Sequence, residues 1–112
     1  MLMRPLSIAM VCYPALGGSG VVASELARGL AARGHRVHVL ATELPDRAWG
    51  GPGDLRFERV EVPSSPVFEH GPYCLAVASR IVDLARREPI DVVHLHYAIP
   101  HAASALLSLI HI

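Results

Sequence analysis

The segment LSIAMVCYPALGGSGVVASEL, residues 6–26, decides the fold of this chain. Its first part, Leu6–Cys12, is a continuous apolar run, which is the pattern of a parallel strand covered on both faces. The glycine motif Gly17–Gly20 follows, and a helical apolar spacing begins directly after it. We therefore expect a strand, a tight turn from Tyr13 to Gly20 and a helix, in that order.

The rest of the chain alternates between further predicted strands and helices. The first helix should run to about Arg33, stop at Gly34 and carry its apolar side chains at Val21, Val22, Leu26 and Leu30. The other expected elements are strands at Val37–Ala41, Arg56–Val62 and Ile90–His96, a helix at Tyr73–Arg87, and a third helix that starts near Pro100. Strands that alternate with helices imply right-handed crossovers, and so an α/β fold with a parallel sheet.

Composition limits the chain to one small globular domain. Its 112 residues are 52% hydrophobic and 18% charged, and ten basic residues balance ten acidic ones. This neutral balance argues against nucleic acid or a membrane surface as a partner. The apolar run near the N-terminus is too short to cross a membrane and lacks a cleavage site, so we expect a cytoplasmic protein. Cys12 and Cys74 are far apart and are expected to be reduced thiols.

The glycine motif is the first candidate binding site. Ligands of parallel sheets bind beyond the carboxyl ends of the strands, where a helix N-terminus and glycine amides can hold an anion. The expected phosphate-binding residues are Gly17, Gly18 and Gly20, and Ser19 adds a hydroxyl. The stretch GSGVVA also fits a dinucleotide fingerprint, with Glu43 near the place of the ribose-binding acid. An NAD(P)-binding oxidoreductase domain and a turn without a ligand both remain open at this point.

The segment HLHYAIPH, residues 94–101, is the second candidate. His94 and His96 share one strand face, but the only neighbouring carboxylate is Asp91, so we expect no metal site. Tyr97 follows the strand end, where its phenol can bond a substrate oxygen. His96 could line the same cleft, and His101 could line it or cap the next helix. Tyr73, beside a loop, is a further residue for the cleft edge.

Three stretches together resemble a known family. They are CYPALGGSGVVASEL at Cys12–Leu26, PVFEHGPYCLAVASR at Pro66–Arg80 and DVVHLHYAIPHA at Asp91–Ala102. The chain resembles glycosyltransferase family 4, and within it the members that transfer N-acetylglucosamine to L-malate in bacillithiol biosynthesis. The resemblance extends to about Ala105, and the second and third stretches make it specific.

The resemblance implies the N-terminal half of a GT-B fold, a Rossmann-like parallel sheet with flanking helices. It implies transfer from UDP-N-acetylglucosamine to L-malate with retention, without a metal or other cofactor, in a protein that could form a homo-oligomer when full length. The amides of Gly17, Gly18 and Gly20 would face the donor diphosphate, while Ser19 and Tyr97 would contact the acceptor. It identifies no catalytic residue.

The resemblance also raises an expectation about domain organisation. Residues 1–106 would be a partial acceptor-side domain, and residues 107–112 would be a non-native tail. The family's H-G-[ST]-D segment and its donor domain do not occur in the chain. We therefore expect this chain to be inactive by itself.

Overall fold

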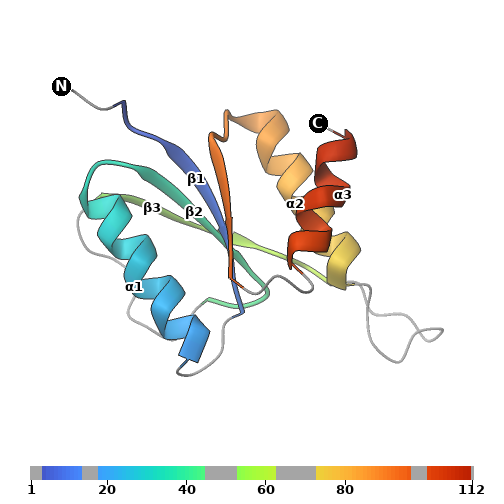
Figure 1. The fold of residues 1–112 in the computed structure, drawn as a ribbon, viewed down its shortest axis with the longest axis horizontal. Coiled ribbons are helices and arrows are strands. Elements are labelled where there is room, and N and C mark those ends of the chain that lie inside the picture. The colour runs from blue at the N-terminus through green and yellow to red at the C-terminus, as the bar shows by residue number, and fades with distance from the viewer. Residues whose placement is uncertain (1–3, 14–17, 45–52, 63–72, 97–100, 112) are drawn as a thin grey trace.

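A computed structural model describes residues 4–13, 18–44, 53–62, 73–96 and 101–111, with no side-chain placement for 18–20 and 109–111. Within these residues a sheet of parallel strands lies between helices (Figure 1). Along the chain the elements are β1 (Ser7–Val11), α1 (Gly18–Ala32), β2 (Arg36–Ala41), β3 (Asp54–Arg59), α2 (Tyr73–Arg87), β4 (Val92–Leu95) and α3 (His101–His111). The strand order is β3-β2-β1-β4, which confirms the predicted α/β class.

Strand β1 lies at the centre of the core. It pairs with β2 on one side and with β4 on the other, both in parallel. Met10 and Cys12 pack in the cluster beneath α1, whereas Ala9 and Val11 pack in the cluster beneath α2. All four side chains are fully buried, as the continuous apolar run predicts for a strand covered on both faces.

Helix α1 approaches the sheet through small side chains, and the sequence prediction was wrong for Val22 and Leu26. The buried stripe is Ala23, Ala27 and Ala31, spaced four residues apart, while Val22 is 58% exposed and Leu26 is 37% exposed. Alanine lets a helix backbone lie close to a sheet, so the contacting face consists of the alanines. Of the larger residues at helical spacing, Leu30 still packs against this cluster, whereas Val22 and Leu26 are exposed.

The end of α1 has the geometry of a Schellman motif, as the predicted stop at Gly34 requires. Gly34 has a φ of 98°, its amide donates to the carbonyl of Ala31 at 3.0 Å, and the His35 amide donates to that of Leu30 at 3.2 Å. A left-handed residue is needed at this position, and glycine adopts that conformation without strain.

We predict opposite effects for two glycine-to-alanine substitutions in this helix. Gly34→Ala should lower the free energy of unfolding by about 1–2 kcal/mol, because alanine is strained at positive φ although its Cβ would have room. Gly29→Ala, also with open space around the added Cβ, should raise it by about 0.5–1 kcal/mol, because Gly29 is within the helix. Urea unfolding measures both values. Equal effects of the two substitutions would contradict the assigned helix end.

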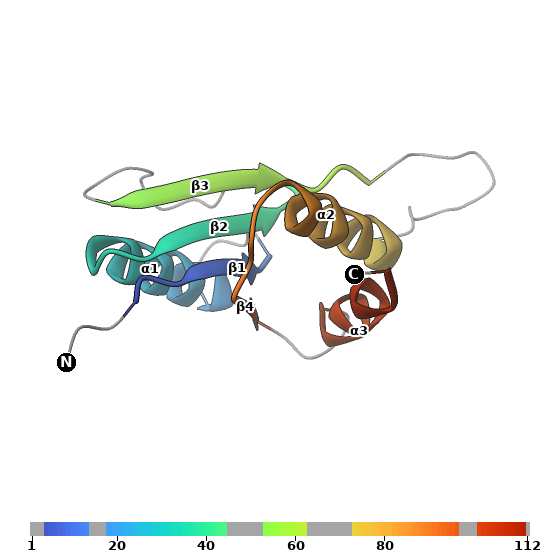
Figure 2. The ribbon, with the colours of Figure 1, turned by 90° about the horizontal axis from the view of Figure 1, so that it is seen from above.

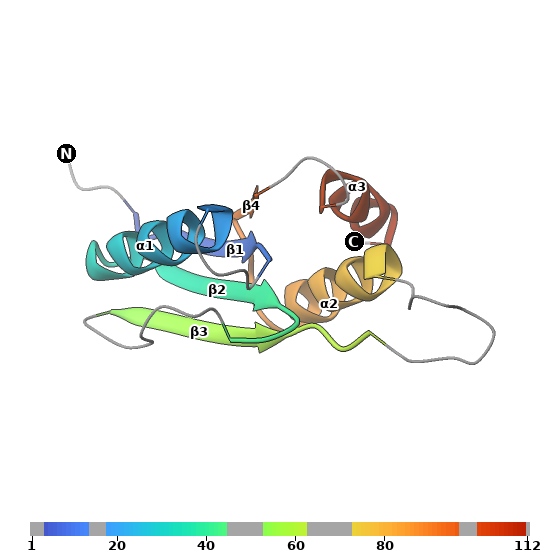
Figure 3. The same cartoon turned by 90° about the horizontal axis from the view of Figure 1, so that it is seen from below.

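Helix α2 covers the other face of the sheet, and α3 packs against α2. The buried side chains of α2 are Val77, Ala78, Ile81, Val82 and Leu84, and its last turn holds Arg86 and Arg87. Figures 2 and 3 both show α2 and α3 side by side. The two helical layers therefore sandwich the sheet.

A polar network also joins α2 to the sheet. His38 on β2 is fully buried, and its Nδ1 lies 3.1 Å from Oε1 of Glu58 on β3. Its Nε2 lies 3.2 Å from Oε2 of Glu88, which follows α2, although this contact lacks the alignment of a hydrogen bond. The carboxylates in turn bind arginines, Glu58 with Arg80 and Glu88 with Arg36 and Arg56. The network therefore links two strands to both the middle and the end of α2.

The two outer strands differ from their predicted bounds. β3 begins two residues earlier than expected, because Arg36 on β2 binds Asp54 at 2.7 Å and this pair is the first of the register. It ends at Arg59 and not at Val62. β4 is shorter than Ile90–His96, although the amides of Asp91 and His96 continue its ladder to the carbonyls of Ser7 and Val11. Within the described residues β4 pairs with β1 alone, and Val92 is 41% exposed.

The topology places a switch point between β1 and β4. From β1 the chain moves outward through β2 to β3, and it returns through α2 to place β4 on the opposite side of β1. The helices α1, α2 and α3 all begin at the end of the sheet where the strands finish (Figure 1). Parallel sheets bind ligands at such a point. No helix among the described residues is both long and apolar enough to span a membrane.

Candidate functional site

The predicted phosphate-binding motif lies at this carboxyl edge. Gly18, Ser19 and Gly20 are the first three residues of α1, so the helix begins inside the motif and not after it. Gly17 lies outside the described residues, as does Tyr97. Helix α1 therefore directs its free amides and the positive end of its dipole toward the switch point.

All three helices that begin at this edge share one electrostatic property. None of α1, α2 and α3 has an acidic residue in its first turn. An acidic side chain there would neutralise the partial positive charge of a helix N-terminus. The edge therefore combines three positive helix ends, an arrangement that favours anionic ligands such as phosphates and carboxylates.

A cluster of aromatic and imidazole rings occupies the same edge. We call it the edge cluster, and its members are Tyr13 after β1, Tyr73 at the start of α2, His96 after β4 and His101 at the start of α3. The Tyr13 ring stacks on Tyr73 with centroids 5.7 Å apart, and it lies 4.7 Å from the ring of His101. His101 is fully buried among these rings. The cluster thus joins the ends of β1 and β4 to the starts of α2 and α3.

Both ring nitrogens of His101 have hydrogen-bond partners. Nδ1 lies against the backbone carbonyl oxygen of His96, and Nε2 lies 2.8 Å from the Tyr73 hydroxyl. A carbonyl can only accept, so Nδ1 carries the proton, and in the neutral ring Nε2 then accepts from Tyr73. The result is a directed chain from the Tyr73 hydroxyl through His101 to the carbonyl of His96.

Burial keeps the groups of this region uncharged. It lowers the pKa of His101 below 6.5, although the hydrogen bond to the His96 carbonyl opposes that shift. It also raises the pKa of the Tyr73 hydroxyl, with smaller contributions from Tyr13 and both cysteines. Burial raises the pKa of the Cys12 thiol to about 11, so Cys12 remains a protonated thiol at neutral pH.

His94 and His96 lie on one side of β4, as the two-residue period predicts. Their ring centroids are 4.8 Å apart, and desolvation, then the neighbouring His94 and His101, lower the pKa of His96. Asp91 is at the opposite end of β4, where its carboxylate accepts from the Ser7 amide at 2.8 Å. The part of the chain that the structure describes contains no group of three or more potential metal ligands.

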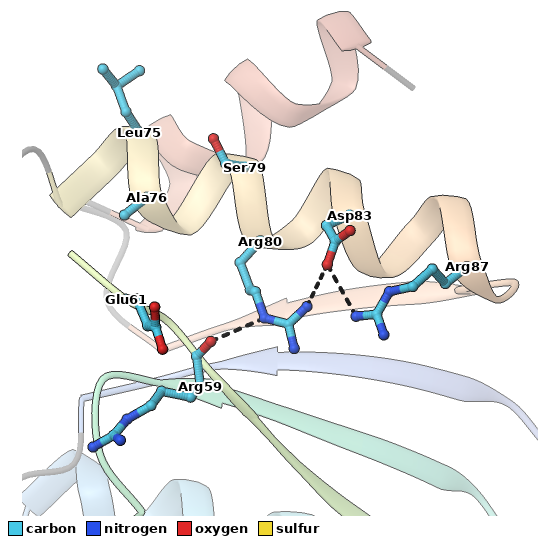
Figure 4. Close-up of a pocket in the computed structure, with 8 residues that line it drawn as sticks. All are labelled: Arg59, Glu61, Leu75, Ala76, Ser79, Arg80, Asp83 and Arg87. Atoms are coloured by element: carbon cyan, nitrogen blue, oxygen red, sulfur yellow. Dashed lines mark hydrogen bonds and ion pairs between the residues drawn. The ribbon is translucent and has the colours of Figure 1, made fainter. Parts of the chain in front are cut away.

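A separate groove of about 730 Å³ lies between α2 and the end of β3 (Figure 4). Its guanidinium groups are already paired: Arg80 binds Asp83 at 2.7 Å and the Arg59 carbonyl at 3.0 Å, and Arg87 binds Asp83 at 3.1 Å. None of the edge-cluster residues lines this groove. We therefore place the candidate site at the carboxyl edge and not here.

The structure brings together only part of the set that the sequence predicts. His96 and His101 lie in one cluster at the edge where α1 also begins, and their contact with a ligand stays a prediction. Tyr73, expected at the cleft edge, lies in the same cluster, and its hydroxyl is bonded to His101. Sequence reasoning missed Tyr13, for which an aromatic residue directly after a central strand was the available signal.

Comparisons with known proteins agree with this architecture. The model of Glycosyltransferase Family 4 matches residues 16–112. A solved structure, a glycosyltransferase from Rickettsia africae ESF-5, superposes with a TM-score of 0.60 at 20% identity, over 98% of this chain and 28% of that one. The solved structure agrees with the α/β fold, and the family match over residues 16–112 shows that the chain belongs to glycosyltransferase family 4.

A curated relative is closer in sequence. The chain is 46% identical to the N-acetyl-alpha-D-glucosaminyl L-malate synthase of Bacillus anthracis over 103 residues. That alignment covers 92% of this chain. The chain spans 27% of the length of that relative. The family resemblance that the sequence motifs carried is thereby confirmed, and it favours a transferase over the nicotinamide-dependent alternative.

The lowered pKa values of the edge cluster predict a specific loss of stability with pH. Since the unfolded chain binds protons more readily at His96 and His101, stability should fall as pH drops below about 6.5. The effect should begin well above the ordinary aspartate pKa of 3.8, so carboxylate titration does not obscure it. Chemical unfolding at a series of pH values measures the slope. His101→Gln should reduce this slope, and an unchanged slope in that variant would contradict the assignment.

Proposed function

We propose that this chain forms the acceptor side of an enzyme that transfers N-acetylglucosamine from UDP-N-acetylglucosamine to L-malate. The malate hydroxyl oxygen bonds to the anomeric carbon, the bond from that carbon to the diphosphate breaks, and UDP leaves with the hydroxyl proton. The anomeric configuration is retained, and no metal or other cofactor takes part. The family membership supports sugar transfer, and the similarity to the malate synthase supports this choice of substrates.

The observation that carries the proposal is that three helices, none with an acidic residue in its first turn, begin at the carboxyl edge of the sheet. Both proposed substrates are anions, one a nucleoside diphosphate sugar and the other a dicarboxylate. Helix N-termini bind such groups through free amides and a favourable dipole. The proposed roles follow: the amides of Gly17, Gly18 and Gly20 face the diphosphate, and the hydroxyls of Ser19 and Tyr97 hold malate.

The proposed setting is the cytoplasm. Cys12 and Cys74 are both free thiols, which is consistent with a reducing compartment. The proposed partners are the two small substrates, with no nucleic acid or membrane.

The test is an assay of the intact gene product that contains these residues. With UDP-N-acetylglucosamine and L-malate, we expect UDP release that depends on malate, and an α-linked product by NMR. Succinate is a matched control, because it has both carboxylates but lacks the hydroxyl that accepts the sugar. It should inhibit competitively and give no release above background. Release that malate does not increase would rule out the malate assignment but leave the family intact.

We predict that Ser19→Ala and Tyr97→Phe each weaken malate binding. Loss of one hydrogen bond to a charged ligand costs about 1.5–3 kcal/mol, so KM for L-malate should rise by roughly tenfold or more in each variant. KM for UDP-N-acetylglucosamine should change little. Ser79→Ala on the exposed side of α2 is the matched control and should leave both constants unchanged. A rise in the donor KM alone would contradict the acceptor role of both residues.

A further inference from the structure

We propose that the outer face of helix α2 is a self-association surface, on which a second copy of this chain docks about a two-fold axis. The surface consists of a row of exposed side chains, Leu75, Ser79 and Asp83, with a groove on each side of it. We call this row the α2 ridge. None of its residues is assigned to a substrate, so the proposal does not depend on which sugar or acceptor the protein uses.

The α2 ridge follows from helical spacing. Leu75, Ser79 and Asp83 are four residues apart, so their side chains lie in one row along the helix. All three are exposed, Leu75 by 58% and the side chain of Asp83 by 59%. Leu75 and Ser79 point away from the sheet (Figure 4). Such a row is the element that one helix inserts into the groove of another when two helices pack.

The grooves on the two sides share this ridge. The groove of about 730 Å³ between α2 and the end of β3 is lined by all three ridge residues, and so is a second groove of about 400 Å³ on the side of α3. The apolar residues Ala78, Val82 and Leu107 also line the second groove. A surface that carries both a ridge and grooves can dock against its own copy, because each ridge then enters a groove of the other.

The charges around the grooves favour a second copy over a partner of one sign. Glu61 and Asp83 line the larger groove together with three arginines, Arg59, Arg80 and Arg87. Asp83 and Arg86 line the smaller one. A two-fold contact brings a surface against itself, so a surface of one sign would repel its copy, whereas this one places acids against arginines. A polyanion would instead meet Glu61 and Asp83.

Two further properties allow these charges to pair between copies. A guanidinium has five N–H groups, so Arg80 and Arg87 retain donors after binding Asp83. The chain has a formal net charge of zero, so two copies approach each other without long-range repulsion. The rim of the contact is therefore electrostatically compatible with self-association.

Leu75 is the apolar anchor of the contact. It is a large apolar side chain that lines both grooves, and we place it in the smaller groove of the other copy, among Ala78, Val82 and Leu107. Apolar side chains that become buried at the centre of an interface carry much of its binding energy. A contact through one pair of helices is at the small end of the range for protein interfaces, so the expected Kd is in the micromolar range.

Sedimentation velocity of the intact gene product tests the association. Between about 1 and 100 μM the protein should change from monomer to dimer. Leu75→Arg should raise the Kd about tenfold or more, because a charge replaces the apolar anchor. Val22→Arg is the matched control, since Val22 is also 58% exposed but lies on α1, and it should leave the Kd unchanged. Ser79→Ala keeps the ridge small and should also leave the Kd unchanged.

A cross-link locates the axis. Ser79 is in the middle of the α2 ridge, so the two copies should bring their Ser79 residues face to face. In Ser79→Cys, a short bis-maleimide should therefore join two chains. In Val22→Cys the yield should not exceed that of the unsubstituted protein, whose Cys12 and Cys74 provide the background. A circular dichroism melt shows whether each variant is folded, and Leu75→Ser replaces Leu75→Arg if the latter is not.

Three results would overturn the proposal. One is a monomer over the whole concentration range. Another is an equal effect of Leu75→Arg and Val22→Arg on the Kd, because association would then use another face. The third is a loss of stability in Leu75→Arg that does not depend on protein concentration, because another part of the same gene product would then cover the ridge. None of these results bears on the sugar transfer proposed above.

Discussion

Strand β1 is held between two helical layers, with Met10 and Cys12 beneath α1 and Ala9 and Val11 beneath α2. Both neighbouring strands take their register from it. Because its side chains are buried on both faces, the strand cannot slip by one residue without moving every side chain to the other layer. That constraint determines where β1 ends, and so where the switch point and the edge cluster lie.

The carboxyl edge is suited to anions because its helices offer free amides at their N-termini and have no acidic residue in their first turns. Three helices begin there, and none has a carboxylate in its first turn. The acidic side chains of α2 and of the strands are instead bound by arginines or by His38, as Glu58, Asp83 and Glu88 show. Glu88 is thus held in ion pairs at the amino end of the sheet, whereas Glu58, near the end of β3, is paired with Arg80 of α2.

Much of the fold could be predicted because its signals are local. The apolar run of β1, the glycine at the end of α1 and the bounds of α2 each depend on residues within one element, and each prediction agrees with the structure. The bounds of β3 and the contact face of α1 could not be predicted in this way. They depend on a partner from another element, Arg36 for β3 and the sheet surface for the alanine stripe.

The sequence by itself determined the α/β class, the place of the glycine motif at the start of α1 and the family, because each depends on the order and kind of residues along a short stretch. Only the tertiary structure decided what His101 does. Its partner Tyr73 is 28 residues away, and no periodicity connects them. The two meet because α2 and α3 begin at the same edge of the sheet, and burial then requires that both ring nitrogens of His101 find partners.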